Sequence, residues 1–412
     1  MQSASSAAVS GTSTGRTGDP ATAAPVPATP GLLRSLNNRT VLDLLIQHPA
    51  LSRGDVCRMT GVSKPTASQL LTRLLESELV LDAGPGSPRP GGRPPQMYRL
   101  NPRAGFAAAI NVDPTTIEVR VADLVGNTIA ESTLPTEAVD GNHGPDRAVE
   151  VLEATAAQAG ISLDDLAATV IGAPGSYDPL TDQLRYSDHL PDWQETGLIA
   201  HLQRSIPGTV AVENDVNLVA VVEQHEREGG AENFVLLWLD ERIGGAIVVD
   251  GKLFRGTRGA AGEAAFLQVP GVPVVHNPAQ DNHGGFEDLA GQDAILGLAA
   301  RAGISSSSAA DAVAALVARD TQAAREAVDE IAGRYAVGLA SILALLDPAQ
   351  VILAGSVAAA GGQQLVDAVT KELNAVAIAT PPVSAGTVTD SPITRGAMIL
   401  SLGHARDRVF NT

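Results

Sequence analysis

Three segments near the start of the chain carry apolar residues at the spacing of an amphipathic helix. The first, NRTVLDLLIQHP, repeats its apolar positions with helical periodicity until Pro49 ends the pattern. In the second, RGDVCRMT, Val56 and Met59 supply the inward face of a short helix. Gly61 then permits a tight turn, and Ser63 can cap the third helix. This order of elements predicts a helix-turn-helix.

The third helix, in SKPTASQLLTRLLE, has one apolar face and one polar face. Its inward residues are Ala67, Leu70, Leu71 and Leu74. The outward side chains are of the kinds that pair with base edges and phosphates in the major groove of DNA. The residues expected to contact DNA from this helix are Lys64, Thr66, Ser68, Gln69 and Arg73. The alternative is the solvated face of an ordinary three-helix domain.

A Gly/Pro-rich loop between two strand-like segments follows this helix. The segments LVLD and MYRL predict the strands of a wing, and the loop between them contains Arg89 and Arg93. An arginine flanked by glycine and proline, as in GGRPP, can enter the narrow minor groove of A·T-rich DNA. A flexible linker would explain the glycines and prolines but not the strands. We therefore expect a winged helix-turn-helix over residues 33–103, preceded by a disordered tail over residues 1–32.

From Phe106 to the end of the chain, strand patterns alternate with helix patterns. The segments FAAAINV, TIEVRVADL and TIAESTLP read as strands, and TVAVENDVNLVAVVEQHE reads as a strand followed by a helix. The segment NFVLLWLDERIGGAIVVDGKLFRG reads as two strands around a glycine pair. Two halves of this kind, joined by a long helix near AREAVDEIAGRYAVGLASILALL, predict a bilobed α/β domain with a cleft. We expect this domain to span residues 104–412.

The distribution of charge divides the chain at the same place. The 412 residues carry a formal net charge of −18, which by itself argues against a nucleic-acid partner. Residues 1–103 contain 11 Lys and Arg against 6 Asp and Glu, a net charge of +5, so the remainder carries −23. A small basic module joined to a large acidic one is expected when only the first meets DNA.

Other features exclude several classes of protein. Cys57 is the single cysteine, so an internal disulfide framework and a zinc site built from several thiolates are excluded. No apolar run in the sequence approaches the roughly 20 residues needed to span a bilayer. The first residues also lack the apolar core of a secretory signal. We therefore expect a cytoplasmic protein with no membrane partner.

Six motifs along the chain carry a resemblance to a known family: SKPTASQLLTRLLE, GGRPPQMYRLNP, IGAPGSYDP, VENDVNLVAVVE, GAAGEAAF and DPAQVILAG. From about Leu36 to the C-terminus the chain resembles the ROK family of repressors, uncharacterised open reading frames and sugar kinases. The match is to the repressor branch, which places a winged helix-turn-helix before a sugar-kinase-like domain of the actin/hexokinase type. The resemblance implies regulators of sugar metabolism, usually repressors, that act as homodimers or tetramers. It also implies that a sugar or sugar phosphate in the cleft releases the DNA.

The loops that would bind a nucleotide depart from the pattern of the kinases in this family. Kinase members carry an Asp-x-Gly-x-Thr loop, in which the aspartate helps to hold Mg²⁺ and the glycine lets backbone amides approach the phosphates. The same positions here are occupied by Asn111, Val112, Asp113, Pro114 and Thr115. The second phosphate segment, usually Gly-Thr-Gly, is replaced by Asp240, Glu241 and Arg242. These changes predict no ATP binding, no cofactor and no kinase activity.

The zinc motif of the family is also missing from the sequence. Pro278, Gln280 and Gly285 stand at the cysteine positions, and Phe266 stands at the position of the histidine. Nearby side chains that could still hold a metal are those of His276, Asp281 and His283. Without thiolates, the favoured interpretation is that these are surface-loop residues and that no metal binds.

The positions that would bind a sugar keep polar residues. The resemblance implies that Asn214 and Asp215 match the Asn-Asp pair whose aspartate is the general base in the kinases. It implies too that Glu263 and Glu287 match glutamates that hydrogen-bond sugar hydroxyls. The alternatives are that Asn214 or Asp215 merely caps the helix that follows, and that both glutamates are solvated loop acids. Because Phe266 replaces the ring-contacting histidine, a different ligand, weak binding or no ligand stays open.

The chain is therefore expected to be a DNA-binding transcriptional regulator, a repressor of genes for sugar uptake or catabolism, that binds a double-stranded operator. The acidic module is expected to form the homodimer or tetramer and to sense a sugar or sugar phosphate. Two alternatives remain open. One is an ATP-dependent sugar kinase that uses Asp215 as its base, and the other is a regulator controlled by a protein partner such as a sugar-transport component.

Overall fold

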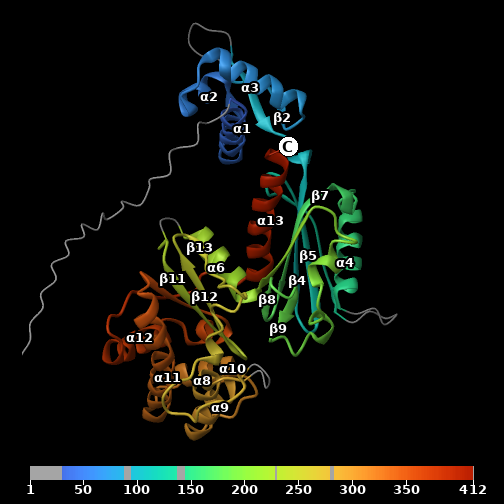
Figure 1. Ribbon diagram of the computed structural model, residues 1–412. Helices are drawn as coiled ribbons and strands as arrows, with labels where there is room; N and C mark the ends of the chain where they lie inside the picture. The colour runs from blue at the N-terminus through green and yellow to red at the C-terminus, as the bar shows by residue number, and fades with distance from the viewer. Residues whose placement is uncertain (1–29, 88–93, 137–143, 228–229, 279–282, 412) are drawn as a thin grey trace, which may run out of the picture.

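A head and two lobes make up the protein (Figure 1). The computed structural model describes residues 30–87, 94–136, 144–227, 230–278 and 283–411, with side chains from residue 38. Residues 1–29, which form most of the predicted tail, lie outside the described residues, as do Arg89 and Arg93 of the wing loop. Within the described ranges, none of the helices is both long and apolar enough to cross a membrane.

The head combines helices with a small antiparallel sheet. Its elements are α1 (Pro30–Gln47), β1 (Leu51–Ser52), α2 (Arg53–Thr60), α3 (Lys64–Glu76), β2 (Val80–Pro85) and β3 (Gln96–Leu100). Strands β2 and β3 are the predicted wing strands. Strand β1, which the sequence pattern did not predict, pairs antiparallel with β3 and ties the wing to the start of α2.

Short polar side chains and one glycine set the ends of the head helices. Ser52 caps α2 and forms a capping box with Asp55. Gly61 ends α2 with a φ of 73°, a left-handed conformation that glycine adopts without strain. Ser63 accepts a hydrogen bond from the backbone N–H of Thr66 at the start of α3. These signals are local in the sequence, which is why the helix-turn-helix could be predicted.

The predicted apolar face of α3 is confirmed, whereas one prediction for α2 is wrong. Leu70, Leu71 and Leu74 are buried together with Ala67. Met59, which was expected to face inward, is 38% exposed. A residue three positions after Val56 is rotated by about 60° from it around the helix, which is enough to leave the narrow core of so small a domain.

The first lobe is built around a mixed sheet with helices on both faces. Its strands are β4 (Phe106–Val112), β5 (Thr116–Asp123), β6 (Thr128–Pro135), β7 (Leu166–Ala173) and β10 (Thr209–Asn214). Their order is β10-β7-β4-β5-β6; β4, β5 and β6 pair antiparallel, and β7 pairs parallel with β4 and β10. Helix α4 (Gly144–Gln158) covers one face and α13 (Pro392–Phe410) the other (Figure 1). Between β7 and β10 lie β8 (Ser176–Asp178), β9 (Gln183–Arg185) and α5 (Leu198–Leu202).

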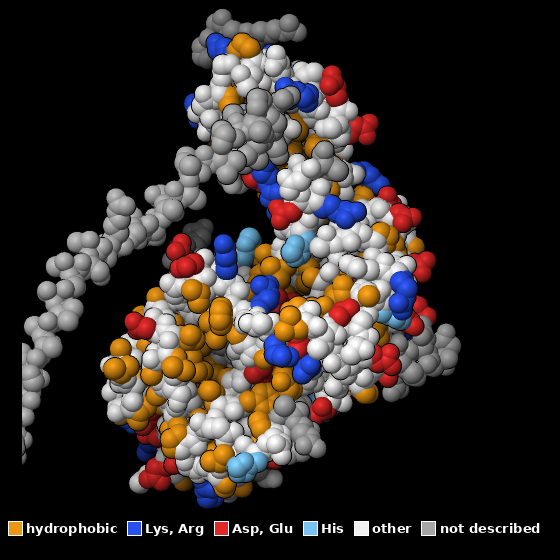
Figure 2. Space-filling model, in the orientation of Figure 1, with side chains coloured by type: hydrophobic (Ala, Val, Ile, Leu, Met, Phe, Trp, Pro, Cys, Tyr) orange, Lys and Arg blue, Asp and Glu red, His pale blue; other side chains and the backbone are white. Residues whose placement is uncertain are grey.

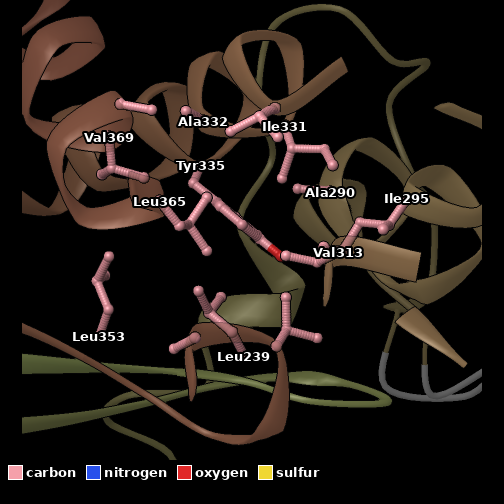
Figure 3. Packing of buried hydrophobic residues seen from close by; sticks show 14 of the residues in the cluster. Leu239, Ala290, Ile295, Val313, Ile331, Ala332, Tyr335, Leu353, Leu365 and Val369 are labelled. Carbon is pink, nitrogen blue, oxygen red and sulfur yellow. The ribbon is translucent and has the colours of Figure 1, made fainter. Parts of the chain in front are cut away.

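The second lobe repeats this arrangement of strands. Its sheet has the order β13-β12-β11-β14-β15, formed by β11 (Phe234–Leu239), β12 (Ile243–Val249), β13 (Lys252–Leu253), β14 (Gln350–Ala354) and β15 (Val383–Ala385). Its helices are α8 (Gly285–Ala290), α9 (Gln292–Arg301), α10 (Ala309–Val317), α11 (Gln322–Leu346) and α12 (Ser356–Val376). Figure 3 shows Tyr335 of α11 buried among Ile331, Val313 and Leu365 in the core of this lobe.

The glycine pair of the second lobe lies inside β12 and not between two strands as predicted. Gly244 and Gly245 pair with residues of β11 in the ladder, and the turn is formed by residues 240–242. A Cβ at Gly245 would lie 2.8 Å from the carbonyl oxygen of Gly262. The pair therefore allows a neighbouring backbone to approach the sheet closely.

The long helix α11 does not join the two lobes, and that prediction is wrong. It packs against α8, α9, α10 and α12, all of the second lobe. Helix α6 (Asp215–Glu226) lies between the lobes instead, because it packs on α13 of the first lobe and on β12 of the second. The apolar pattern of α11 shows that its faces are buried but not which partner covers them.

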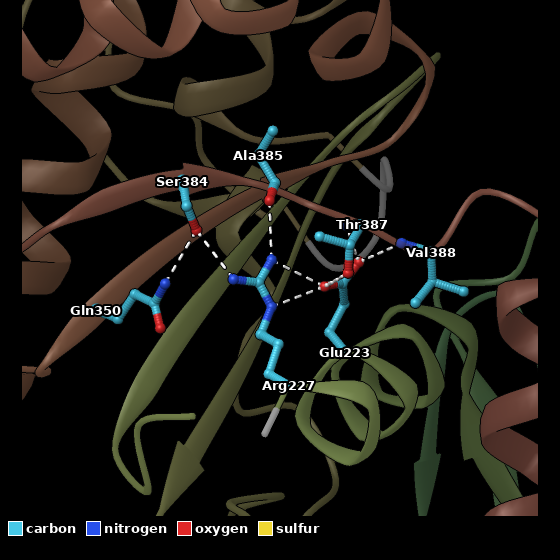
Figure 4. Close-up of polar contacts among 7 residues, drawn as sticks. All are labelled: Glu223, Arg227, Gln350, Ser384, Ala385, Thr387 and Val388. Carbon is cyan, nitrogen blue, oxygen red and sulfur yellow. Dashed lines mark hydrogen bonds and ion pairs between the residues drawn. The ribbon is translucent and has the colours of Figure 1, made fainter. Parts of the chain in front are cut away.

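Buried polar contacts hold α6 to the segment that returns from the second lobe to the first. The fully buried carboxylate of Glu223 accepts hydrogen bonds from the backbone N–H groups of Thr387 and Val388 at 2.6 and 2.8 Å (Figure 4). Arg227 pairs with Glu223 and donates to the carbonyl oxygen of Ala385 at 2.8 Å. A buried charge is tolerated when it is paired and hydrogen-bonded in this way.

The packing of α13 on α6 predicts opposite effects for two glycines of α13. A Cβ at Gly396 would lie 2.0 Å from the carbonyl oxygen of Leu218, whereas a Cβ at Gly403 would meet nothing within 4 Å. We expect Gly396→Ala to lower the free energy of unfolding by about 1–3 kcal/mol through overpacking. Gly403→Ala should raise it by about 0.5–1 kcal/mol, since alanine favours a helix. Urea denaturation of both variants is the measurement, and equal effects would contradict this view of the α6–α13 contact.

Candidate functional site

The outer face of α3 is the first candidate site. Lys64, Thr66, Gln69 and Arg73 are exposed, as expected for residues that meet DNA. Ser68 is half-buried, and its hydroxyl donates a hydrogen bond to the Lys64 carbonyl oxygen at 2.9 Å. The hydroxyl proton is therefore already used inside the helix. The contributions of Arg89 and Arg93 stay predictions of the sequence, because both residues lie outside the described part of the chain.

The boundary between the lobes is the second candidate site, and α6 lies there in contact with both lobes. Asn214 is the N-cap of α6: its side-chain oxygen accepts from the N–H of Asn217, and its amide nitrogen donates to the Gly175 carbonyl oxygen, both at 3.0 Å. Asn214 therefore caps the helix that follows it, as the alternative interpretation of the sequence expected. Contact between Asn214 and a sugar stays a proposal.

The carboxylate of Asp215 follows directly and is in an unusual electrostatic position. It accepts a hydrogen bond from the N–H of Val216 at 2.8 Å. Burial, together with the nearby carboxylates of Glu263 and Asp240, raises the pKa of Asp215 to about 7. A carboxyl group with a pKa near neutrality can act as a hydrogen-bond donor as well as an acceptor.

The two predicted glutamates are hydrogen-bonded and partly buried, so they are not solvated loop acids. Glu263 belongs to the second lobe and accepts a hydrogen bond from the hydroxyl of Ser176 in the first lobe. Glu287, in α8, accepts from the backbone N–H of Ile243 at 2.9 Å. Burial raises the pKa of both glutamates, and the charge of Arg242 opposes that rise. The structure thus brings Asp215 near Glu263, and both glutamates near Arg242.

Further side chains of the two lobes meet at this boundary. Arg258 forms an ion pair with the fully buried carboxylate of Asp178 at 3.4 Å. The rings of Tyr186, from the first lobe, and Phe266, from the second, lie 5.2 Å apart at an interplanar angle of 53°. Tyr186 has a φ of 59°, which strains a bulky residue and is typical of ligand clamps.

Sequence reasoning missed Ser176 and Tyr186 as candidate residues. Ser176 belongs to the motif IGAPGSYDP, so its place beside the cleft could have been inferred from the resemblance. Tyr186 carries no local signal, because its partner Phe266 is far away in the sequence and its backbone conformation appears only in the folded chain.

In the turn between β4 and β5, the hydrogen-bond donors bind a carboxylate of the same turn. The Asp113 carboxylate accepts from the N–H groups of Thr115 and Thr116 at 2.7 and 2.8 Å, and from both threonine hydroxyls. Although burial opposes it, this set of hydrogen bonds lowers the pKa of Asp113. The backbone amides of this turn are therefore already bonded to a carboxylate.

The turn after β11 also holds a hydrogen-bonded carboxylate. Asp240 follows β11 and accepts a hydrogen bond from the hydroxyl of Ser356, the first residue of α12, at 2.7 Å. Gly355, just before it, has a φ of 98° and allows the end of β11 and the start of α12 to meet closely. The negative charge of Asp240 thus occupies a helix N-terminus, where a phosphate would otherwise be favoured.

The region of the zinc motif is described only in part. His283 forms an ion pair with Asp288, and Gly285 is the first residue of α8. Gln280 and Asp281 lie outside the described residues. In the ranges that are described, no group of three or more His, Cys, Asp or Glu side chains is placed to hold a metal ion.

An apolar pocket of about 280 Å³ lies between β11, β12 and the end of α11. Its walls include Val235, Ile247, Ile342 and Leu345, and Glu263 is at its edge. Hydrophobic side chains gather over the second lobe on the face shown in Figure 2. Such walls offer few partners to sugar hydroxyls, so the carboxylates around Asp215 are the better candidate for a sugar site.

Comparisons with known proteins agree with this architecture. Residues 107–403 match the family model described as ROK family, and residues 35–86 match the one described as MarR family. The chain is 24% identical over 269 residues to the xylose repressor of Caldicellulosiruptor bescii, covering 65% of this chain and 66% of that protein. It is 24% identical over 238 residues to the xylose repressor of Bacillus subtilis, covering 58% and 61%. The matched region spans less than two thirds of the length of these relatives.

Solved structures show the same fold. A ROK family transcriptional regulator, a homologue of the E. coli MLC protein, superposes with a TM-score of 0.72 at 16% identity, covering 92% of this chain and 98% of that one. The ROK hexokinase from Thermus thermophilus superposes with a TM-score of 0.60 at 24% identity, covering 73% and 99%. At these identities the likeness concerns the fold alone, which is a winged helix-turn-helix before an α/β domain of the actin/hexokinase type. Because the matched family model covers well over half of its residues, the chain belongs to the ROK family.

Proposed function

We propose that the protein is a transcriptional regulator that represses genes of sugar uptake or catabolism by binding a DNA operator. The observation that carries this proposal is the capped helix α3, whose buried face is apolar and whose exposed face presents Lys64, Gln69 and Arg73. A helix of this kind behind a helix-turn-helix bend fits the major groove. The xylose repressors among its relatives support the link to sugars.

The regulator acts in the cytoplasm as a homodimer or tetramer. A dimer presents two α3 helices to two operator half-sites about one helical turn of DNA apart, which multiplies the affinity of a single head. The head is the part of the chain with net positive charge, so it supplies the counterion-releasing contacts to phosphates.

The effector is a neutral sugar that binds between the lobes. Carboxyl groups whose pKa is raised can donate to one hydroxyl and accept from another, which suits a polyol. Those of the carboxyl groups of Asp215, Asp240, Glu263 and Glu287 that are ionised would repel a phosphate, so a sugar phosphate is disfavoured. The rings of Tyr186 and Phe266 add an apolar surface at the cleft mouth, where the family's kinases have a histidine.

Phosphoryl transfer is not part of this function. Nucleotide phosphates need donor amides and a cation, whereas Asp113 and Asp240 place carboxylates at both phosphate positions. Asp215 has the raised pKa of a general base, and this observation favours a kinase as the second candidate function. A regulator controlled by a protein partner is the third.

The raised pKa of Asp215 makes stability depend on pH in a definite direction. A carboxyl group with a folded pKa of about 7 and an ordinary value of 3.8 binds its proton more tightly in the folded chain. The folded state therefore loses stability as the pH rises from the ordinary value to about 7, and the loss is complete above it.

Asp215→Asn removes this loss, because an amide does not ionise and its oxygen can still accept from the Val216 N–H. We expect the variant to melt above the wild type at pH 8 by about 1–2 °C, because 1 kcal/mol shifts the melting temperature by only about 1 °C in a chain of this length. The difference should shrink toward pH 5. Thermal melts across that pH range are the measurement, and a difference independent of pH would contradict the role given to ionisation.

Two substitutions on α3 separate base contact from phosphate contact. On an operator selected with the purified protein, Gln69→Ala should weaken binding by about 10-fold and leave random DNA unaffected. Lys64→Ala should weaken binding to both and reduce the salt slope by about 1. Lys371→Ala, which removes a cation paired with Asp329 in the second lobe, is the matched control. Equal losses on operator and random DNA for Gln69→Ala would show that it does not read a base.

Sugar sensing is tested by measuring operator affinity with a panel of neutral pentoses and hexoses and with their phosphate esters. We expect at least one neutral sugar to weaken operator binding by about 10-fold, with a smaller effect from its phosphate ester. Glu263→Gln should reduce the response. A panel without effect would remove the sensing role and leave the DNA-binding role intact. Sugar-dependent ATP turnover that Asp215→Ala abolishes would establish the kinase instead.

A further inference from the structure

Helix α13 runs from α6 to the head (Figure 1). Near its start, Thr394 donates a hydrogen bond to Glu118 of β5 at 2.7 Å, and Arg395 forms an ion pair with Glu226 at the end of α6. Gly396 then contacts the backbone of Leu218, only three residues after Asp215. With so little space between the helices, a displacement of α6 displaces α13 as well.

At the other end of α13, apolar residues pack with the core of the head, and Arg39 of α1 adds a polar contact. The Arg39 guanidinium pairs with Asp407 of α13 at 2.6 Å and lies 5.3 Å from the ring centroid of Phe410. It also pairs with Asp43, one turn further along α1, at 3.0 Å. Phe410 is buried, so the guanidinium is held between an apolar ring and two carboxylates on different helices.

The body of α13 is fixed to the first lobe between these two ends. Arg406 donates to the carbonyl oxygens of Leu124 and Val125, and Leu402 and Ala405 belong to one apolar cluster with the core of the head. The same cluster contains Leu218 of α6. Packed side chains thus form a continuous path from the start of α6 to the core beneath the DNA-binding helix.

If the covalent link were the only attachment, the head could rotate relative to the first lobe. The chain passes from β3 through a short 3-10 turn, Pro102–Ala104, into β4. A second attachment, away from the covalent one, is needed to stop rotation about such a link. The contact of α1 with α13 is that attachment.

We propose that Arg39 is the positioning residue that fixes the DNA-binding head to α13, and that the cleft acts on the operator through this contact. The action of the cleft on the operator rests on the proposed function. The carboxylate of Asp407 is 60% exposed, so its pair with Arg39 is weak enough to be exchanged when α13 shifts. An exchangeable contact suits a head that must take two orientations.

The two carboxylates that contact Arg39 provide a matched pair of variants. Asp407→Asn weakens the contact between the head and α13, whereas Asp43→Asn changes the charge by the same amount within α1. Arg39→Ala removes both pairs and the contact with Phe410. Arg39 and Asp407 are partly exposed, so these variants should fold, and a melting curve checks that they do.

Head orientation is measured directly by spin-label distances in the full chain. Cys57→Ser removes the native thiol, and Met59→Cys in α2 with Glu153→Cys in α4 places labels on the head and the first lobe. We expect one narrow distance distribution, little changed by Asp43→Asn and broadened about twofold or more by Asp407→Asn and Arg39→Ala, since an orienting pair is lost. An unchanged distribution in Arg39→Ala would overturn the proposal, as would equal broadening in the two aspartate variants.

The link to the cleft is measured as the ratio of operator affinities without and with an effective neutral sugar. Asp407→Asn should reduce this ratio by about threefold, while sugar affinity measured by calorimetry in the absence of DNA stays as in the wild type. An unreduced ratio would overturn the proposed action of the cleft on the operator through the Arg39 contact. If no sugar changes operator binding by the wild type, the sensing function fails, and the distance measurement still decides the role of Arg39.

Discussion

The close packing of α6 against α13 is the contact on which the arrangement of the molecule depends. Helix α6 touches the sheets of both lobes, and α13 covers the first sheet and reaches the head. Gly396 lets the two helices meet at backbone distance, and Glu223 ties α6 to the segment that leads into α13. Interiors packed this tightly are hardly compressible, so a displacement of α6 is passed on to α13.

The carboxyl groups at and near the boundary between the lobes differ in the donors that they accept from. Asp215, Glu263 and Glu287 each keep a hydrogen-bond donor that makes their burial tolerable: the Val216 N–H, the Ser176 hydroxyl and the Ile243 N–H. Asp113 and Asp240 accept hydrogen bonds from donors in their own turn or at a neighbouring helix N-terminus. The proposed preference for an uncharged polyol over a polyphosphate rests on these carboxyl groups.

Local signals in the sequence were sufficient for the head and for the strand pattern of both lobes. Ser63, Gly61 and the apolar face of α3 act within a few residues of one another, so their meaning does not depend on the rest of the fold. Met59 was misjudged because a short helix buries only a narrow stripe. The glycine pair of β12 was misjudged because close backbone approach and a turn require the same residue type.

By itself, the sequence determined the helix-turn-helix and wing, most strands of both lobes, the division into a basic and an acidic module, and which residue types stand in each motif. These follow from periodicity, capping and composition, which are properties of neighbouring residues. Only the tertiary structure decided that α6 and not α11 joins the lobes, that Ser176 meets Glu263 and Tyr186 meets Phe266, and that Arg39 meets Asp407. Those pairs are separated by tens to hundreds of residues, and their contact depends on how whole elements pack, which no local pattern encodes.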